Sequence, residues 1–143
     1  MEKFSSYDLQ FAIELKGEGV EAETLEMIKE FGLMDRTVFT SFQYAYIKKT
    51  KELDPEAKVG WIISEVSEQV IEDLLAIGAE QIVPKADPLT AEQVKRCREA
   101  GLDVRGCCVS KLGLMRKLCG LGVDGMTVNF PDRLYEDMNH LGL

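Results

Sequence analysis

The chain is short of the residues from which many catalytic and metal sites are built. Histidine occurs once, as His140, so a site that takes two or three histidines from one chain is excluded. The four cysteines include no C-x-x-C pair, which favours buried, reduced thiols over a zinc site or a disulfide framework. Adjacent Cys107 and Cys108 are expected to project to opposite faces of a strand.

Basic residues and long apolar runs are also scarce. The chain has 17 Lys and Arg residues and 25 Asp and Glu residues, which gives a net charge of −8. It therefore lacks the excess of positive charge that is typical of nucleic-acid-binding proteins. No apolar run approaches the roughly 20 residues of a membrane helix, and Met1–Gln10 lacks the basic start and apolar core of a secretory signal. We therefore expect a cytoplasmic globular protein in which residues 1–143 form a single domain.

What the chain does contain is an alternation of amphipathic and short apolar segments. Gly32, Gly78, Gly101 and Gly122 each end an amphipathic run and are spaced by 46, 23 and 21 residues, with a turn at 53–55 where one glycine is left out. Glycine favours such helix ends because it adopts the left-handed conformation without strain. The short apolar runs predict buried parallel strands at Phe11–Leu15, Thr37–Thr40, Lys58–Ile63, Gln81–Val83, Val104–Val109 and Gly125–Val128.

Three of the intervening segments carry apolar residues at helical spacing. A capping box at Thr90–Gln93 marks the start of one of these helices. The predicted apolar stripes are Leu25, Ile28 and Phe31; Val70, Ile71, Leu74 and Leu75; and Val94, Cys97 and Ala100.

Strands that alternate with helices predict an α/β fold of about six βα units with a parallel sheet and right-handed crossovers. The pattern alone leaves two architectures open, a doubly wound sheet and part of a (β/α)₈ barrel. Six units are too few to close such a barrel, for which about 250 residues is typical. In both architectures the functional end is the C-terminal end of the strands.

Polar side chains occur at that end of several predicted strands. Glu14 and Lys16 alternate with the apolar residues of the first strand, so both should face away from the helices. Such a pair binds a ligand, a metal ion or, in the structural alternative, each other. Ser41 and Asn129 follow the second and last strands and suggest a polar rim together with Ser64 and Ser110, although helix N-capping is an alternative for the three serines.

Four segments in order resemble the glycerophosphodiester phosphodiesterase family. Phe11–Lys16 is similar to its strand ending in Glu-Leu-Lys, and Val38–Phe42 is similar to its strand ending in Ser-Ser-Phe. Leu89–Val104 is similar to a helix and strand of the family, and Leu121–Asp132 to its closing segment. The family fold is a (β/α)₈ barrel, so the resemblance implies an incomplete TIM barrel.

The resemblance also implies a function in lipid and glycerol metabolism. The family hydrolyses glycerophosphodiesters to glycerol 3-phosphate and an alcohol with a divalent cation, Ca²⁺ or Mg²⁺. By this resemblance Glu14 is a metal ligand and Lys16 contacts the phosphate, while Ser41 and Asn129 are candidate substrate-binding residues. These roles fit the preference of hard cations for carboxylate oxygens and the need to neutralise phosphoryl charge.

The chain departs from the family in its catalytic motifs. The family's His-Arg-Gly strand, its Glu-x-Asp metal ligands and its second catalytic histidine are absent, and its aromatic strand residue falls at about Cys107. One carboxylate gives weak or no cation binding, because about six oxygen ligands are wanted. We therefore expect no catalytic residue, and no phosphodiesterase activity, in this chain alone.

Three interpretations remain open at this stage. The chain is the C-terminal part of a phosphodiesterase barrel whose catalytic motifs lie upstream, or a degenerate βα-barrel module that serves in assembly or binds a phosphate ligand. A receiver-type signalling domain would need clustered acids after the first strand, where the chain has Glu14–Lys16. An open barrel would expose two strand edges, so self-association or a need for the missing segment is expected.

Overall fold

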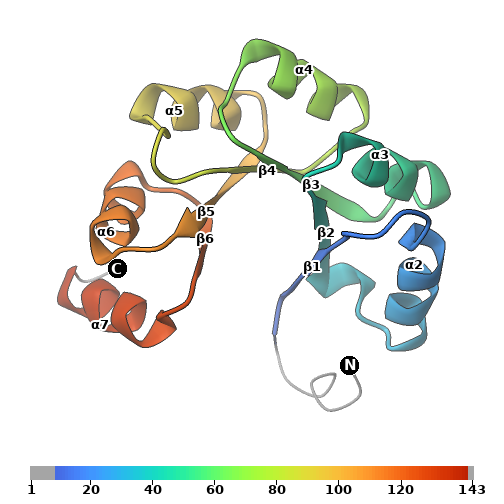
Figure 1. Cartoon of the computed structure of the whole chain (residues 1–143), viewed down its shortest axis with the longest axis horizontal. Coiled ribbons are helices and arrows are strands. Elements are labelled where there is room, and N and C mark those ends of the chain that lie inside the picture. The colour runs from blue at the N-terminus through green and yellow to red at the C-terminus, as the bar shows by residue number, and fades with distance from the viewer. Residues whose placement is uncertain (1–8, 142–143) are drawn as a thin grey trace.

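The computed structural model of the chain describes residues 9–141, and within them a six-stranded parallel sheet carries helices on one face (Figure 1). The strands are β1 (Phe11–Glu14), β2 (Thr37–Ser41), β3 (Lys58–Ile63), β4 (Gln81–Pro84), β5 (Asp103–Val109) and β6 (Gly125–Val128). The helices are α2 (Glu21–Glu30), α3 (Tyr44–Leu53), α4 (Glu68–Ala76), α5 (Ala91–Glu99), α6 (Leu112–Leu121) and α7 (Pro131–Leu141), with a 3₁₀ turn η1 at Met34–Arg36.

The strand order settles the choice between the two architectures. The strands lie in the order β1-β2-β3-β4-β5-β6, whereas a doubly wound sheet reverses its order at a switch point and carries helices on both faces. Figure 1 shows the strands as a curved arc with the helices along its outside, and β1 faces β6 across the open side. The expected incomplete (β/α)₈ barrel of six parallel βα units is confirmed.

The local signals in the sequence mark the elements closely. All six predicted strands are present, and their bounds differ from the prediction by at most one residue at either end. The four helix-ending glycines all have a left-handed backbone, with φ between +63° and +82°. At the turn without a glycine, the Asp54 carboxylate accepts the backbone N–H of Glu56 and pairs with Lys29 at 2.7 Å. The capping box at Thr90 and Gln93 is also confirmed.

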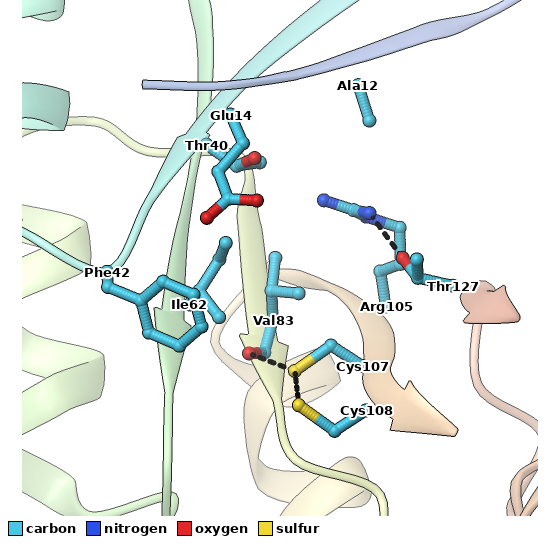
Figure 2. A pocket seen from close by; sticks show the side chains of 10 residues that line it. All are labelled: Ala12, Glu14, Thr40, Phe42, Ile62, Val83, Arg105, Cys107, Cys108 and Thr127. Atoms are coloured by element: carbon cyan, nitrogen blue, oxygen red, sulfur yellow. Dashed lines mark hydrogen bonds between the residues drawn. The ribbon is translucent and has the colours of Figure 1, made fainter. Parts of the chain in front are cut away.

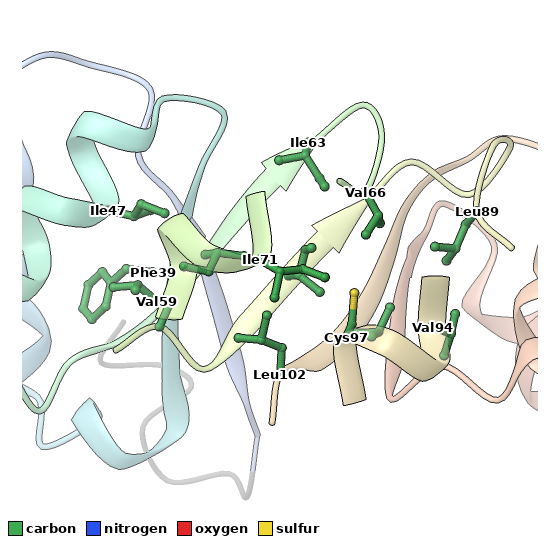
Figure 3. Packing of buried hydrophobic residues seen from close by; sticks show 14 of the residues in the cluster. Phe39, Ile47, Val59, Ile63, Val66, Ile71, Leu89, Val94, Cys97 and Leu102 are labelled. Atoms are coloured by element: carbon green, nitrogen blue, oxygen red, sulfur yellow. The ribbon is translucent and has the colours of Figure 1, made fainter. Parts of the chain in front are cut away.

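The main hydrophobic core lies between the outer face of the sheet and the helices (Figure 3). Ile71 and Leu74 of α4 and Val94 and Cys97 of α5 are buried there, as their spacing predicts. Leu75 is an error in that prediction, because it is 47% exposed on the outside of α4. Burial on one helical stripe holds helices α2 to α6 to the sheet and leaves the concave face of the arc uncovered.

The concave face carries alternate residues of the strands, except at Cys107 and Cys108 of β5. Ile62, Val83 and Cys107 form a small apolar cluster there, separate from the main core. Ala12 and Glu14 of β1 lie on the same face, which confirms that Glu14 points away from the helices.

No helix among residues 9–141 is long and apolar enough to span a bilayer.

Candidate functional site

A cavity of about 320 Å³ opens on the concave face, toward the C-terminal ends of the strands (Figure 2). Side chains of both edge strands, β1 and β6, reach it, so the curvature of the sheet brings the two ends of the arc to one space. The lining residues are Ala12, Glu14, Thr40, Phe42, Ile62, Val83, Arg105, Cys107, Cys108 and Thr127. The cavity thus combines an apolar floor with one acidic and one basic group.

Glu14 and Lys16 lie together at the end of β1. The Lys16 Nζ atom is 3.5 Å from Glu14 Oε2, and the Lys16 side chain is 76% exposed. Both residues also border a neighbouring hollow of about 330 Å³, which they share with Ser41 and Phe42. Glu14 therefore stands between the cavity and this outer hollow, with the ammonium group of Lys16 beside it.

Ser41 lies in the same hollow, but its hydroxyl is engaged by the backbone. It is buried, donates a hydrogen bond to the Leu15 carbonyl at 2.7 Å and accepts one from the Gln43 N–H at 3.0 Å. The hydroxyl thereby ties the end of β2 to the end of β1. N-capping by Ser41, Ser64 and Ser110 is wrong, because the N-caps of α3, α4 and α6 are Gln43, Ser67 and Lys111.

Asn129 is not brought to this group by the structure. It is exposed in the bend after β6 and lines neither the cavity nor the hollow. His140 lies on α7, where its Nδ1 atom is 2.9 Å from the Glu136 carbonyl oxygen. The structure therefore places three of the four candidate site residues, Glu14, Lys16 and Ser41, in one region of the molecule. The fourth, Asn129, lies outside it.

Arg105 is the principal residue that the sequence reasoning missed. It lies in the middle of β5 and lines the cavity, and its Nε donates to Gln81 Oε1 of β4 at 2.9 Å and its Nη1 to Thr127 Oγ1 of β6 at 2.8 Å. Burial lowers the pKa of the Arg105 guanidinium, and the nearby Cys107 and Glu14 oppose that shift. Its alternation with Cys107 along the strand is the signal in the sequence that places it on the concave face.

The expectation that Cys107 and Cys108 face opposite sides of a strand is wrong. Their Sγ atoms are 3.8 Å apart and both side chains line the cavity (Figure 2). The pairing of β5 with β6 shifts register between Gly106 and Val109, and Cys108 has a φ of +58°. A β-bulge of this kind breaks the alternation of side chains. Cys107 is buried, as expected of the thiols, but Cys108 is exposed.

The described residues do not by themselves complete a site for Ca²⁺ or Mg²⁺. Residues 9–141 contain no group of three or more His, Cys, Asp or Glu side chains placed to hold a metal ion. Glu14 is the one carboxylate that lines the cavity, whereas these cations take about six oxygen ligands. The charges that border the cavity and the hollow are those of Glu14, Lys16 and Arg105, so this region is more positive than the chain as a whole.

The chain matches known proteins over most of its length. Residues 3–133 match the model of the Glycerophosphoryl diester phosphodiesterase family. The uncharacterized protein YqiK of Bacillus subtilis (strain 168) is 29% identical over 88% of this chain and 55% of its own length. A glycerophosphodiester phosphodiesterase of Caldanaerobacter subterraneus subsp. tengcongensis is 23% identical over 81% of this chain and 48% of its own. The chain thus spans about half the length of these relatives.

Solved structures give the same result for the fold. A glycerophosphodiester phosphodiesterase from Parabacteroides distasonis ATCC 8503 superposes with a TM-score of 0.82 at 22% identity, covering 94% of this chain and 59% of the other. An Oleispira antarctica phosphodiesterase, solved in complex with the product sn-glycerol-3-phosphate, gives a TM-score of 0.80 at 25% identity over 96% and 58%. The open arc corresponds to a part of these longer folds.

Proposed function

The chain belongs to the glycerophosphoryl diester phosphodiesterase family, and we propose that it supplies the phosphate-contacting part of a barrel that hydrolyses glycerophosphodiesters to glycerol 3-phosphate and an alcohol. The observation that carries the proposal is the placement of Glu14 beside Lys16, with Nζ and Oε2 3.5 Å apart, at the C-terminal end of β1 and next to the concave cavity. This is the end of the strands at which barrel enzymes bind their substrates.

The two groups have distinct roles in this proposal. The exposed ammonium of Lys16 offsets the negative charge of the phosphoryl oxygens, an electrostatic effect that grows as charge develops in the transition state. The Glu14 carboxylate contributes to a divalent-cation site whose other ligands come from outside residues 9–141. When bound, such a cation supplies Lewis-acid polarisation of the phosphoryl group.

We expect the 143-residue chain alone to lack turnover. Departure of the alcohol needs a proton donor, and general acid–base catalysis contributes a factor of about 10² to 10⁴. The one histidine of the chain, His140, is exposed on α7 and hydrogen-bonds its own helix rather than the cavity. The proposal therefore separates substrate contact, which this chain supplies, from proton transfer, which the rest of a barrel supplies.

Complementation with the leading βα units of a relative tests this division. The purified chain, incubated with glycerophosphocholine and Ca²⁺ or Mg²⁺, should release no glycerol 3-phosphate. The same chain fused behind the leading units of the Caldanaerobacter enzyme should release it, and Glu14→Gln or Lys16→Ala should lower the rate by at least about 100-fold. Glu18→Gln and Lys48→Ala, at exposed positions outside the cavity and the hollow, serve as controls and should leave the rate unchanged.

Two results would contradict the proposal. Turnover by the chain alone that disappears in Glu14→Gln would show that catalysis needs nothing further. Full activity of the fused protein carrying Glu14→Gln and Lys16→Ala together would show that these residues do not contact the substrate or its cation.

The open edges of the arc favour a second candidate function, a non-catalytic assembly or phosphate-binding module. Within the described residues, β1 pairs with β2 alone and β6 with β5 alone, so each edge strand leaves a row of backbone groups without a partner strand. Such edges pair with further strands. Sedimentation of the chain should show self-association, and a fused protein that binds glycerol 3-phosphate through Lys16 but shows no turnover would favour the module.

A further inference from the structure

The vicinal thiols of Cys107 and Cys108 meet at one wall of the cavity. Consecutive residues of a regular strand point to opposite faces, so this convergence requires the bulge after Gly106 and the left-handed backbone of Cys108, at φ +58°. A left-handed conformation is uncommon for a residue other than glycine. The backbone is thus held in an uncommon conformation at the point where it brings two sulfur atoms together.

The distance between the sulfur atoms suits a particular type of ligand. Two thiolates bound to one tetrahedral cation, with metal–sulfur bonds of about 2.3 Å, lie about 3.8 Å apart. The Sγ atoms of Cys107 and Cys108 are already 3.8 Å apart in the free chain. The two thiols therefore stand at the separation of a bidentate thiolate ligand.

The surroundings leave room for an ion and a route to it. Cys107 packs with Ile62 and Val83 on the concave face, and its thiol donates to the Val83 carbonyl at 3.6 Å. Cys108 is exposed, and both thiols border the cavity of about 320 Å³. An ion held by the pair would have its remaining coordination positions directed toward this space.

We propose that Cys107 and Cys108 bind a soft divalent cation of the zinc class through both sulfur atoms, with the remaining positions open to water or to an anionic ligand in the cavity. Each thiol gives up its proton, so one cation binds and two protons are released. Soft thiolate ligands select zinc and cadmium over Mg²⁺ and Ca²⁺, so the site is chemically distinct from a carboxylate site at Glu14.

Cadmium titration of the full chain tests the site. The protein is kept reduced with a phosphine, and Cd²⁺ binding is followed by the ultraviolet thiolate-to-metal charge-transfer band and by equilibrium dialysis. We expect one Cd²⁺ per chain, retained against a 100-fold excess of Mg²⁺. Cys107→Ser and Cys108→Ser should each weaken binding at least tenfold, whereas Cys119→Ser, on α6 and outside the cavity, should leave it unchanged.

Several outcomes would overturn the proposal. They are Cd²⁺ binding without the charge-transfer band, displacement of Cd²⁺ by Mg²⁺, and equal affinity in a variant that lacks both thiols. Circular dichroism checks the fold of each variant, and Cys108→Ala, at an exposed position, keeps the test valid if changes at buried Cys107 disturb the strand. Because the phosphodiesterase experiment depends on Glu14 and Lys16, each proposal can fail without the other.

Discussion

Gly106 in β5 offers a sharp test of the packing between the sheet and α6. An ideal Cβ built on Gly106 would overlap Leu118 Cδ1 and stand 3.0 Å from Cδ2 and 3.3 Å from Cγ of the same side chain. Attractive contacts between carbon atoms lie at about 3.5–4.0 Å. Leu118 is fully buried on α6, so its side chain has no solvent into which to swing.

We therefore expect Gly106→Ala to destabilise the chain. Overpacking of a filled core costs about 1–3 kcal/mol, while replacing a strand glycine by alanine returns about 0.5–1 kcal/mol of backbone entropy. The overlap with buried Leu118 makes the first effect the larger, which leaves a net loss of about 1–2 kcal/mol. Gly113→Ala is the matched control on α6, because a Cβ at this position meets nothing within 4 Å. This variant should be more stable than the parent chain by up to about 1 kcal/mol.

Urea unfolding followed by circular dichroism, at a fixed protein concentration, measures these differences. Adding Leu118→Ala identifies the contact responsible. Leu118→Ala alone should cost about 2–5 kcal/mol, but the new methyl group at position 106 would fill part of that space. The double variant should therefore lose less stability than the two single variants lose together, by about 1 kcal/mol or more. Equal stability of Gly106→Ala and the parent chain, or strictly additive losses, would refute this packing argument.

Three further predictions concern caps, charge and thiol reactivity. Thr90→Ala removes the capping box of α5 and should lower the free energy of unfolding by about 1 kcal/mol in urea. Burial raises the pKa of Asp124, but its hydrogen bond from Arg98 at 2.7 Å helps hold that pKa below its usual range. The ionised carboxylate therefore stabilises the fold above about pH 4, and this stabilisation is lost as the pH is lowered through the pKa that Asp124 has in the folded chain. Asp124→Asn should make the free energy of unfolding depend less on pH in this acidic range. Alkylation with iodoacetamide at pH 8, read by peptide mass, should modify exposed Cys108 well before Cys107, whose pKa is about 12.

The fold follows from sequence signals that are local. Each strand is a short apolar run closed by turn residues, and each helix-ending glycine has the left-handed backbone expected of it, so the bounds of the six strands could be predicted within one residue. Leu75 shows the limit of the helical pattern. It continues the apolar stripe in sequence, but its position on α4 turns it to solvent, where it is 47% exposed.

The site was harder to predict because its main features depend on several strands at once. Arg105 is held by Gln81 of β4 and Thr127 of β6, neither of which is near it in sequence. The convergence of Cys107 and Cys108 depends on a bulge in the pairing of β5 with β6. Residues 107–109 include no turn-forming residue that would predict this bulge. Glu14 and Lys16, by contrast, belong to one short segment, and alternation along it was enough to place both.

The weakness of the Glu14–Lys16 pair is consistent with the roles proposed for it. An ion pair as exposed as this one contributes about 0–1 kcal/mol, so a ligand can separate its members at little cost. In the proposed function, Glu14 would contribute to a divalent-cation site and Lys16 would contact the phosphate, on the same side of the sheet and at the same strand end. The exposed pair at the end of β1 can therefore give up its internal contact to a ligand without a large loss of stability.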